Sequence, residues 1–279
     1  MKTDKPEGIC KLTGAKGPFV KSHIIPQALS KPDIRGRPFT QAGRDYAPQK
    51  RRDSWYDARM VTRAGEDILA RYDDWAIAEL RRHRLVWSGW GEDEELRADE
   101  MSLIPGAGGM GARKIKDIDA RMLRLFLLSI LWRAAATTLP KFRELRLLPQ
   151  DRKRLARMLC DGRVEPMSFY PAMLFQLSTR GQFHNHTPIA QRKPRNIQKP
   201  EAGTIPIYRF YFDGLIIHFH RKERAKDVRA MGPMMVGGGK DLIVGLRPFE
   251  GSWQQENLVD LITEAQDRWP DRLAKISRS

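Results

Sequence analysis

The chain has 279 residues, of which 41% are hydrophobic and 30% charged, so it is long enough for a sizeable core and too apolar for wholesale disorder. Fifty Lys and Arg against 34 Asp and Glu leave a formal net charge of +16, which attracts polyanions. This charge favours nucleic acid as the partner over an anionic membrane surface. The plainer alternative is a basic protein held in an acidic complex with other protein subunits. The two cysteines exclude a disulfide framework and a four-cysteine zinc site.

Two segments bear on localisation. Residues 1–6 carry charges with no apolar stretch behind them, so no secretory signal is expected. The most apolar run, residues 122–139, contains Arg124 and Arg133 and is barely long enough to span a bilayer, which indicates a buried core helix. We therefore predict a cytoplasmic protein with no membrane partner.

In the first half of the chain, a turn-rich piece leads into a short strand that ends at Pro26. Residues 31–52 are rich in Pro, Gly and Arg and predict a long loop that either binds something or is flexible. Apolar residues at three- and four-residue spacing predict a helix over 66–86. The strongest helix, 117–139, follows a glycine-rich loop and ends at Pro140, and shorter helices are predicted at 150–160 and 171–178.

The pattern changes in the last third of the chain. Residues 191–200 are basic, polar and proline-containing, and predict a linker or an exposed nucleic-acid arm. Asp213-Gly214 predicts a hairpin turn between strands at 205–212 and 215–219. A third strand at 242–246 precedes a final helix over 252–274. We predict an α+β fold with a mostly helical middle and a small antiparallel sheet plus helix at the C-terminus.

The segment 10–26 reads CKLTGAKGPFVKSHIIP, with Cys10 at its start and Ser-His-Ile-Ile-Pro at its end. It resembles the opening of HNH endonucleases, in which a cysteine knuckle precedes a hairpin that ends in an acidic residue or Ser, then His and apolar residues. The resemblance implies an N-terminal HNH-like hairpin within a ββα-type region, here placed at 1–90. We divide the rest into a helical region at 91–200 and a small α+β region at 201–279.

The resemblance also implies a phosphodiester-hydrolysing site. His23 would be the general base, because a neutral imidazole accepts a proton near pH 7. A divalent metal, Mg²⁺ or Mn²⁺, would supply the Lewis acid. The candidate metal ligands are Ser22, where many members have an acidic residue, and Asp73 and Asp74 on the predicted helix. The alternative left open for His23 is a structural histidine at a strand end. For Asp73 and Asp74 it is a solvated helix face.

The resemblance departs from the family at the zinc knuckle. Thr13 stands where a partner of Cys10 is expected, and the second cysteine pair is absent, so we expect no structural zinc. The histidine pairs 184/186 and 218/220 have the spacing of one strand face and could each share a metal, but we do not expect a metal site at either pair. We expect His218 and His220 to form the polar face of their hairpin strand.

Basic residues form five clusters, and aromatic residues that can stack on bases lie beside the first. The candidate nucleic-acid contacts are Lys21, Arg35, Arg37, Arg44, Lys50, Arg51, Arg52, Arg113, Lys114 and Lys116. We predict an HNH-like, metal-dependent endonuclease or its degenerate descendant, acting on DNA or RNA. A phage, mobile-element or phage-defence setting is suggested by analogy. The alternative is a non-catalytic nucleic-acid-binding subunit that retains the HNH scaffold, and a third possibility is a structural protein whose charge serves assembly.

Overall fold

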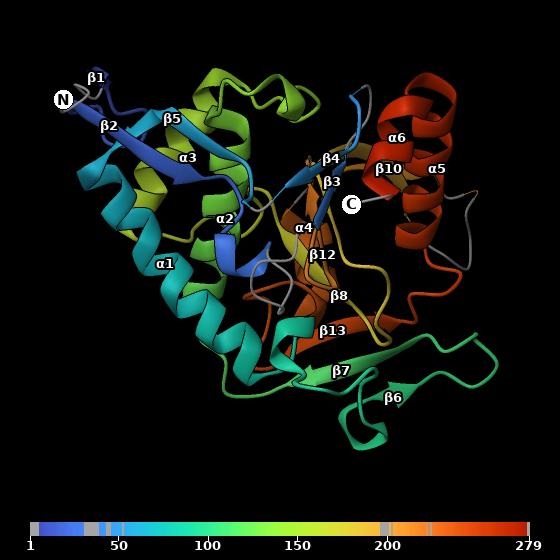
Figure 1. The fold of residues 1–279 in the computed structure, drawn as a ribbon. Helices are drawn as coiled ribbons and strands as arrows, with labels where there is room; N and C mark the ends of the chain where they lie inside the picture. Colours follow the sequence, from blue (N-terminus) through green and yellow to red (C-terminus); the bar gives the residue numbers. More distant parts are fainter. Residues whose placement is uncertain are drawn as a thin grey trace.

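The computed structural model describes residues 6–30, 39–42, 46–51, 53–195, 201, 203–221, 223 and 225–277. Its helices lie on both sides of a large sheet, and a small hairpin region sits at one end (Figure 1). The helices are α1 (Arg63–Arg82), α2 (Ala120–Ala136), α3 (Pro149–Asp161), α4 (Ala225–Met231), α5 (Trp253–Arg268) and α6 (Pro270–Ser277). The predicted α+β class is confirmed.

The strands form three sheets. A seven-stranded sheet has the order β10 (Ile189–Pro194), β11 (Thr204–Phe212), β12 (Leu215–His220), β8 (Ala172–Leu177), β13 (Leu242–Arg247), β7 (Gly111–Ile115) and β6 (Ser102–Leu103). Its neighbours are antiparallel except β13 and β8. One three-stranded sheet has the order β1 (Glu7–Ile9), β2 (Lys16–His23) and β5 (Tyr56–Thr62), and the other β4 (Gln49–Arg51), β3 (Phe39–Ala42) and β9 (His184–His186).

The hairpin region positions His23. Strand β2 pairs antiparallel with β5, placing His23 opposite Tyr56, and Arg63 begins α1 directly after β5 ends. Side chains alternate along β2, so Ser22 is buried while Lys21 is exposed and His23 half-buried. The helix packs beneath the hairpin with buried residues at three- and four-residue spacing: Gly65, Leu69, Tyr72, Ala76 and Leu80.

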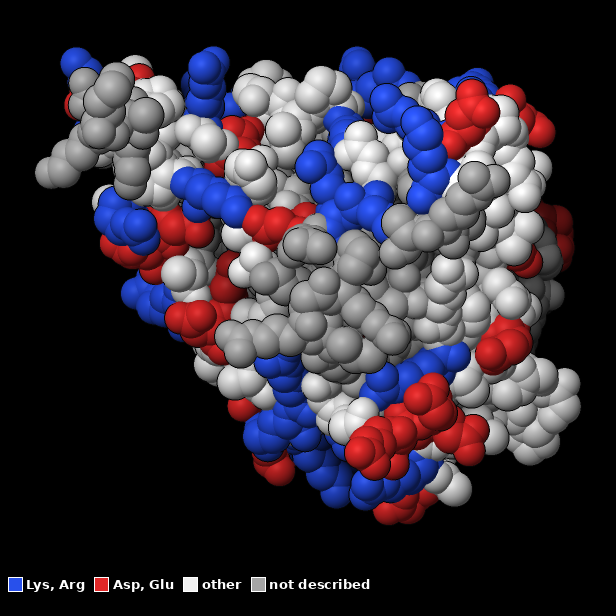
Figure 2. All heavy atoms as spheres, in the orientation of Figure 1, with Lys and Arg blue, Asp and Glu red and all other residues white. Residues whose placement is uncertain are grey.

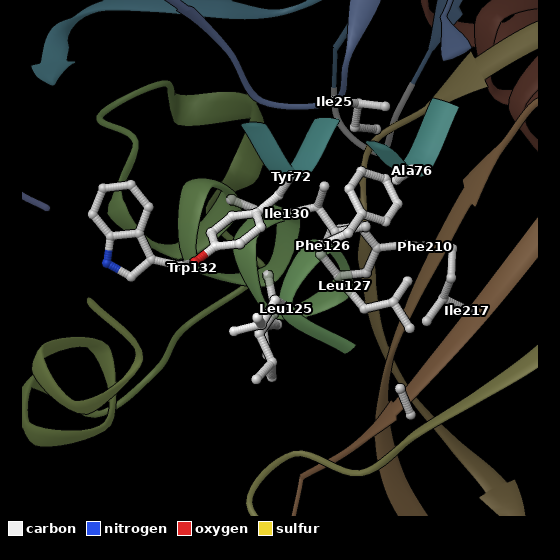
Figure 3. Close-up of a cluster of buried hydrophobic side chains, with 14 of the residues drawn as sticks. Ile25, Tyr72, Ala76, Leu125, Phe126, Leu127, Ile130, Trp132, Phe210 and Ile217 are labelled. Carbon is white, nitrogen blue, oxygen red and sulfur yellow. The ribbon is translucent and has the colours of Figure 1, made fainter. Parts of the chain in front are cut away.

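The main hydrophobic core draws residues from Cys10 to Val244 and so from all three expected regions. Helix α2 is buried on nearly all sides and lies between α1 and the large sheet, with Phe126 towards Phe210 of the sheet and Ile130 towards Tyr72 of α1 (Figure 3). The other face of the sheet packs against α5 through a second cluster that includes Leu258. The expected regions 1–90, 91–200 and 201–279 therefore share a core.

Several predicted elements are confirmed. Helices α1, α2 and α3 lie where the apolar periodicity places them, and strands β11 and β12 flank a hairpin turn at Asp213-Gly214. Both turn residues have positive φ, 49° and 79°, as a two-residue turn of this hand requires. A side chain at Gly214 would also collide with the Trp87 ring, since its Cβ would lie 2.5 Å from that ring.

Other predictions need correction. Residues 171–178 were expected as a helix but form β8, a central strand buried on both faces, whose apolar run has no alternation to reveal it. Part of the predicted linker, 191–194, belongs to β10, and residues 196–200 lie outside the described part of the chain. The middle region thus contributes strands to a sheet expected only near the C-terminus. Among the described residues, no helix is both long and apolar enough to cross a bilayer.

Candidate active site and nucleic-acid interface

The side chain of His23 is held by Asp53, which lies three residues before Tyr56 in the chain. His23 Nε2 lies 3.0 Å from Asp53 Oδ1, and the same oxygen accepts from Gln27 Nε2 over 2.7 Å and from the Ser54 amide over 3.0 Å. Lys21 forms an ion pair with the other carboxylate oxygen. Partial burial raises the pKa of the Asp53 carboxyl, but the hydrogen bonds from Lys21, His23 and Gln27 outweigh it and lower the pKa to about 2.

The charge of Asp53 fixes the tautomer of His23. An ionised carboxylate only accepts hydrogen bonds, so the imidazole carries its proton on Nε2 and donates it to Asp53. In the neutral ring the lone pair is then on Nδ1, for which the described residues offer no partner. A histidine oriented this way by a carboxylate is the arrangement that general-base catalysis uses.

The backbone around His23 is fastened to the core. Its carbonyl accepts from Arg133 Nη1 over 3.1 Å, and the Ile24 amide donates to Trp55 over 2.9 Å. The side chains of Ile24 and Ile25 are fully buried. The end of β2 is therefore a rigid support for the imidazole.

The predicted metal ligands do not assemble around His23. Ser22 is completely buried, on the opposite face of β2, so its hydroxyl points away from the imidazole. Asp73 is bound through both carboxylate oxygens by Arg133, and Asp74 is an exposed residue on α1. Ser22 and Asp73 are therefore engaged elsewhere in this fold and are not placed to bind a metal with His23, while the assignment of Asp74 stays a prediction.

The donor set as a whole does not fit Mg²⁺ or Mn²⁺. Asp53 is the carboxylate that reaches His23, and its oxygens are already occupied by the ammonium of Lys21 and by three other N–H donors. Such a cation needs several carboxylate or carbonyl oxygens. In the described part of the chain, no group of three or more His, Cys, Asp or Glu side chains is placed to share a metal.

The turn that begins at Cys10 packs against α1 and α3. Cys10 is buried, and the Gly65 backbone approaches it so closely that a Cβ there would lie 2.6 Å from Sγ. Burial raises the pKa of the Cys10 thiol, but hydrogen bonds from Thr13 and nearby backbone lower it by more. Cys160, distant in sequence, lies beside this turn with its thiol 3.7 Å from the Leu12 carbonyl oxygen.

A cavity of about 500 Å³ adjoins the His23–Asp53 pair. Asp53 and Tyr56, which both contact His23, also line this cavity. Its wall further contains Lys21, Gln41, Arg51, Ser54, Trp55, Leu139, Pro140 and Lys141. In Figure 2, Lys and Arg side chains lie across the upper part of the drawn face, where Figure 1 shows β2 to β5 beside α5 and α6, and also along its lower edge, where they mix with Asp and Glu.

No family model, curated protein or solved structure matches this chain. The function is therefore inferred from the geometry of the site.

The predicted nucleic-acid contacts fall into three groups. Lys21 and Arg51 line the cavity, and Lys50 is in the adjacent strand β4. Lys114 and Lys116 are exposed on β7 and just after it, where Lys114 forms an ion pair with Asp241 over 2.8 Å. The remaining surface candidates lie outside the described residues: Arg35, Arg37, Arg44 and Arg52.

Arg113 is a wrong prediction. Its side chain is 6% exposed, and all five guanidinium N–H groups donate within the protein. The acceptors are the Gln176 amide, the Glu100 carboxylate and three backbone carbonyls. Arg113 therefore has no donor left for a phosphate, and it joins β7 to β8 of the same sheet and to the segments that follow α1.

The histidine pairs lie inside the protein and not on a polar surface. His184 stacks on Tyr211, with ring centroids 4.8 Å apart, and its Nε2 accepts from Gln254 over 2.7 Å. Burial lowers the pKa of His184 to about 4 and that of His220 to about 3, and lowers the pKa of His218 well below its ordinary value. All three are neutral near pH 7 and serve the packing of the sheet.

Asp53 was missed by sequence reasoning. Asp53 precedes β5, which pairs antiparallel with β2, so the start of β5 lies beside the end of β2, where His23 is. This position in the chain was a usable signal. Gln41 and Lys141 come to the site through tertiary packing and have no comparable signal.

Proposed function

We propose that this chain is an HNH-like nuclease that binds nucleic acid at the cavity beside Asp53 and cleaves a phosphodiester bond with His23 as general base. The observation that carries the proposal is the 3.0 Å contact between His23 Nε2 and Asp53 Oδ1, because it leaves the Nδ1 lone pair available for a proton. The order β2, β5, α1 supports it, since this is the ββα order that the Ser-His-Ile-Ile-Pro resemblance implies.

The chemistry assigned to the site uses this chain's own residues. His23 Nδ1 takes a proton from a water molecule, whose oxygen attacks phosphorus as the bond to the leaving oxygen breaks, and the leaving oxygen takes a proton from solvent water. Arg51 and Lys141 supply positive charge at the cavity, which offsets the charge of the phosphate. A positioned base contributes about a hundred- to ten-thousand-fold to the rate. No step is assigned to a metal, because the donor set does not fit one.

A second candidate is a nucleic-acid-binding protein that no longer cleaves. The observation that favours it is the saturation of Asp53 by Lys21, Gln27 and His23, together with the burial of Ser22. Nucleic-acid binding is common to both candidates. A cytoplasmic location belongs to the proposal and is supported by the free thiols of Cys10 and Cys160.

The test is a cleavage time course on DNA and RNA, with EDTA, Mg²⁺ or Mn²⁺, for wild type and His23→Ala. The nuclease proposal expects wild-type cleavage that persists in EDTA and falls at least a hundredfold in His23→Ala, with binding unchanged. Thermal melts establish that both proteins are folded. Binding without cleavage under any of these conditions selects the second candidate, and cleavage unaffected by His23→Ala places the active site elsewhere.

A further inference from the structure

The cavity beside Asp53 contains buried polar atoms that the protein does not satisfy. Gln41 Nε2, Ser54 Oγ and Trp55 Nε1 have no hydrogen-bond partner among the described residues. The three residues are 1%, 3% and 5% exposed, and all three line the cavity. These atoms have almost no exposed surface, so a ligand pairs them only after a small movement of the cavity wall. Buried polar groups in proteins are nearly always paired, and three unpaired ones on residues of a single cavity point to such a ligand.

We infer that this cavity receives one unpaired nucleobase, and that the site therefore takes single-stranded nucleic acid. The inference rests on the proposed binding of nucleic acid at the same site. A base presents flat apolar faces and an edge of hydrogen-bond acceptors and donors. The cavity has the matching parts, with apolar surface from Trp55, Leu139 and Pro140 and the orphaned amide, hydroxyl and indole N–H.

Cationic side chains at the same cavity suit the phosphate attached to such a base. Arg51 is exposed and makes no side-chain hydrogen bond within the described residues, and Lys141 donates to Gln49 over 3.1 Å. Burial and then the charge of Arg51 lower the pKa of Lys141, so the two cations lie close together. A bound phosphate would relieve this repulsion.

The size and position of the cavity favour one nucleotide next to the reacting bond. Its volume of about 500 Å³ lies within the range of small-molecule sites. Asp53 and Tyr56 connect its wall to His23, so a base in the cavity places its own phosphate near the imidazole. In a duplex the base edge is paired and its faces are stacked, so the cavity discriminates against double strands unless the base is flipped out.

The experiment measures binding by fluorescence anisotropy of a labelled 12-nucleotide single strand and of a hairpin duplex with the same sequence. Wild type is expected to bind the single strand about tenfold more tightly, and the preference should vanish for a strand of abasic sites. Gln41→Ala and Trp55→Phe, which keeps an aromatic ring but removes the indole N–H, should each weaken single-strand binding severalfold and leave duplex binding unchanged. Gln150→Ala, an exposed amide on α3, is the matched control and should change neither.

The outcomes separate this inference from the proposed function. Equal binding of single strand and duplex, or a preference that survives both Gln41→Ala and Trp55→Phe, overturns the base pocket while nucleic-acid binding stands. Binding of neither nucleic acid at low salt overturns both. Thermal melts separate a binding role from a structural one. Ser54→Ala removes an unpaired polar atom and little volume, so it should leave the melting temperature unchanged or raised while single-strand affinity falls.

Discussion

Arg133 and Asp73 form a bidentate ion pair, in which Nη1 donates to Oδ2 over 2.8 Å and Nη2 to Oδ1 over 2.5 Å. The same Nη1 donates to the carbonyl of His23, so α2 and α1 are tied together directly beneath the end of β2. A carboxylate at the position where the HNH resemblance suggests a metal ligand is here used to fix the strand that carries the imidazole.

The first prediction follows from the burial of this pair. Asp73→Ala should lower the free energy of unfolding by about 3–5 kcal/mol, because it leaves the buried Arg133 guanidinium without its counter-charge. Asp74→Ala, one residue away on the exposed side of α1, should change it by no more than about 0.5 kcal/mol. Urea unfolding at pH 7 measures both. A stable Asp73→Ala protein that has lost only metal-dependent cleavage would restore the metal-ligand assignment.

The second prediction concerns the pH dependence that Asp53 contributes. Its pKa falls from 3.8 to about 2 on folding, so between these values the unfolded chain binds more protons than the folded one. The stabilisation is therefore complete above about pH 4 and is lost as the pH falls towards 2. Asp53→Asn removes this titration while keeping an acceptor for His23.

Urea unfolding at pH 6 and at pH 2.5 tests this behaviour. Wild type should exceed Asp53→Asn in stability by more at pH 6 than at pH 2.5, and the difference between the two proteins should shrink steadily through that interval. A difference that is constant with pH would mean that Asp53 is not charged in the folded protein or that its pKa is the same in both states.

The third prediction uses the salt dependence of nucleic-acid binding. Each lost phosphate contact should reduce the slope of log affinity against log salt concentration by about 0.7–0.9. Arg51→Ala and Lys141→Ala should each produce such a reduction, because both cations line the cavity. Lys153→Ala, an exposed cation on α3, should leave the slope unchanged. Equal slopes in all four proteins would remove the cavity from the binding surface.

Local signals in the sequence were sufficient for several elements. The helix at α2 is marked by a long apolar run ended by Pro140, and the turn at Asp213-Gly214 by residues that tolerate positive φ. His23 could be placed at a strand end because the apolar residues Ile24 and Ile25 follow it. These features depend on neighbours in the chain, so they can be recognised without the fold.

The missed features depend on contacts between distant segments. The pairing of Asp53 with His23 crosses 30 residues and follows from the register of β2 and β5. Arg113 has the sequence context of an exposed basic cluster, yet its side chain is buried and donates to Glu100 and Gln176. Charge patterning identifies basic residues but not the internal partners that neutralise them, which is why a basic cluster mixes surface and core positions.

The last prediction concerns acid sensitivity from His184. Burial lowers its folded pKa to about 4, below the ordinary value of 6.5, so between these values the unfolded chain binds a proton that the folded chain does not. Its contribution to stability is complete above about pH 6.5 and is lost as the pH falls towards 4, by about 3 kcal/mol over that interval. His184→Gln cannot gain a proton, so its unfolding free energy should fall less steeply with acid than that of wild type, even if it is lower at pH 7 through lost stacking on Tyr211.

Urea unfolding at half-unit steps from pH 7 to pH 4 gives the unfolding free energy of both proteins against pH. The comparison uses the slopes of the two curves and not their absolute free energies. Parallel curves would show that His184 is not the group that charges on unfolding, and would direct the same experiment to His218 and His220, whose pKa values are also lowered by burial.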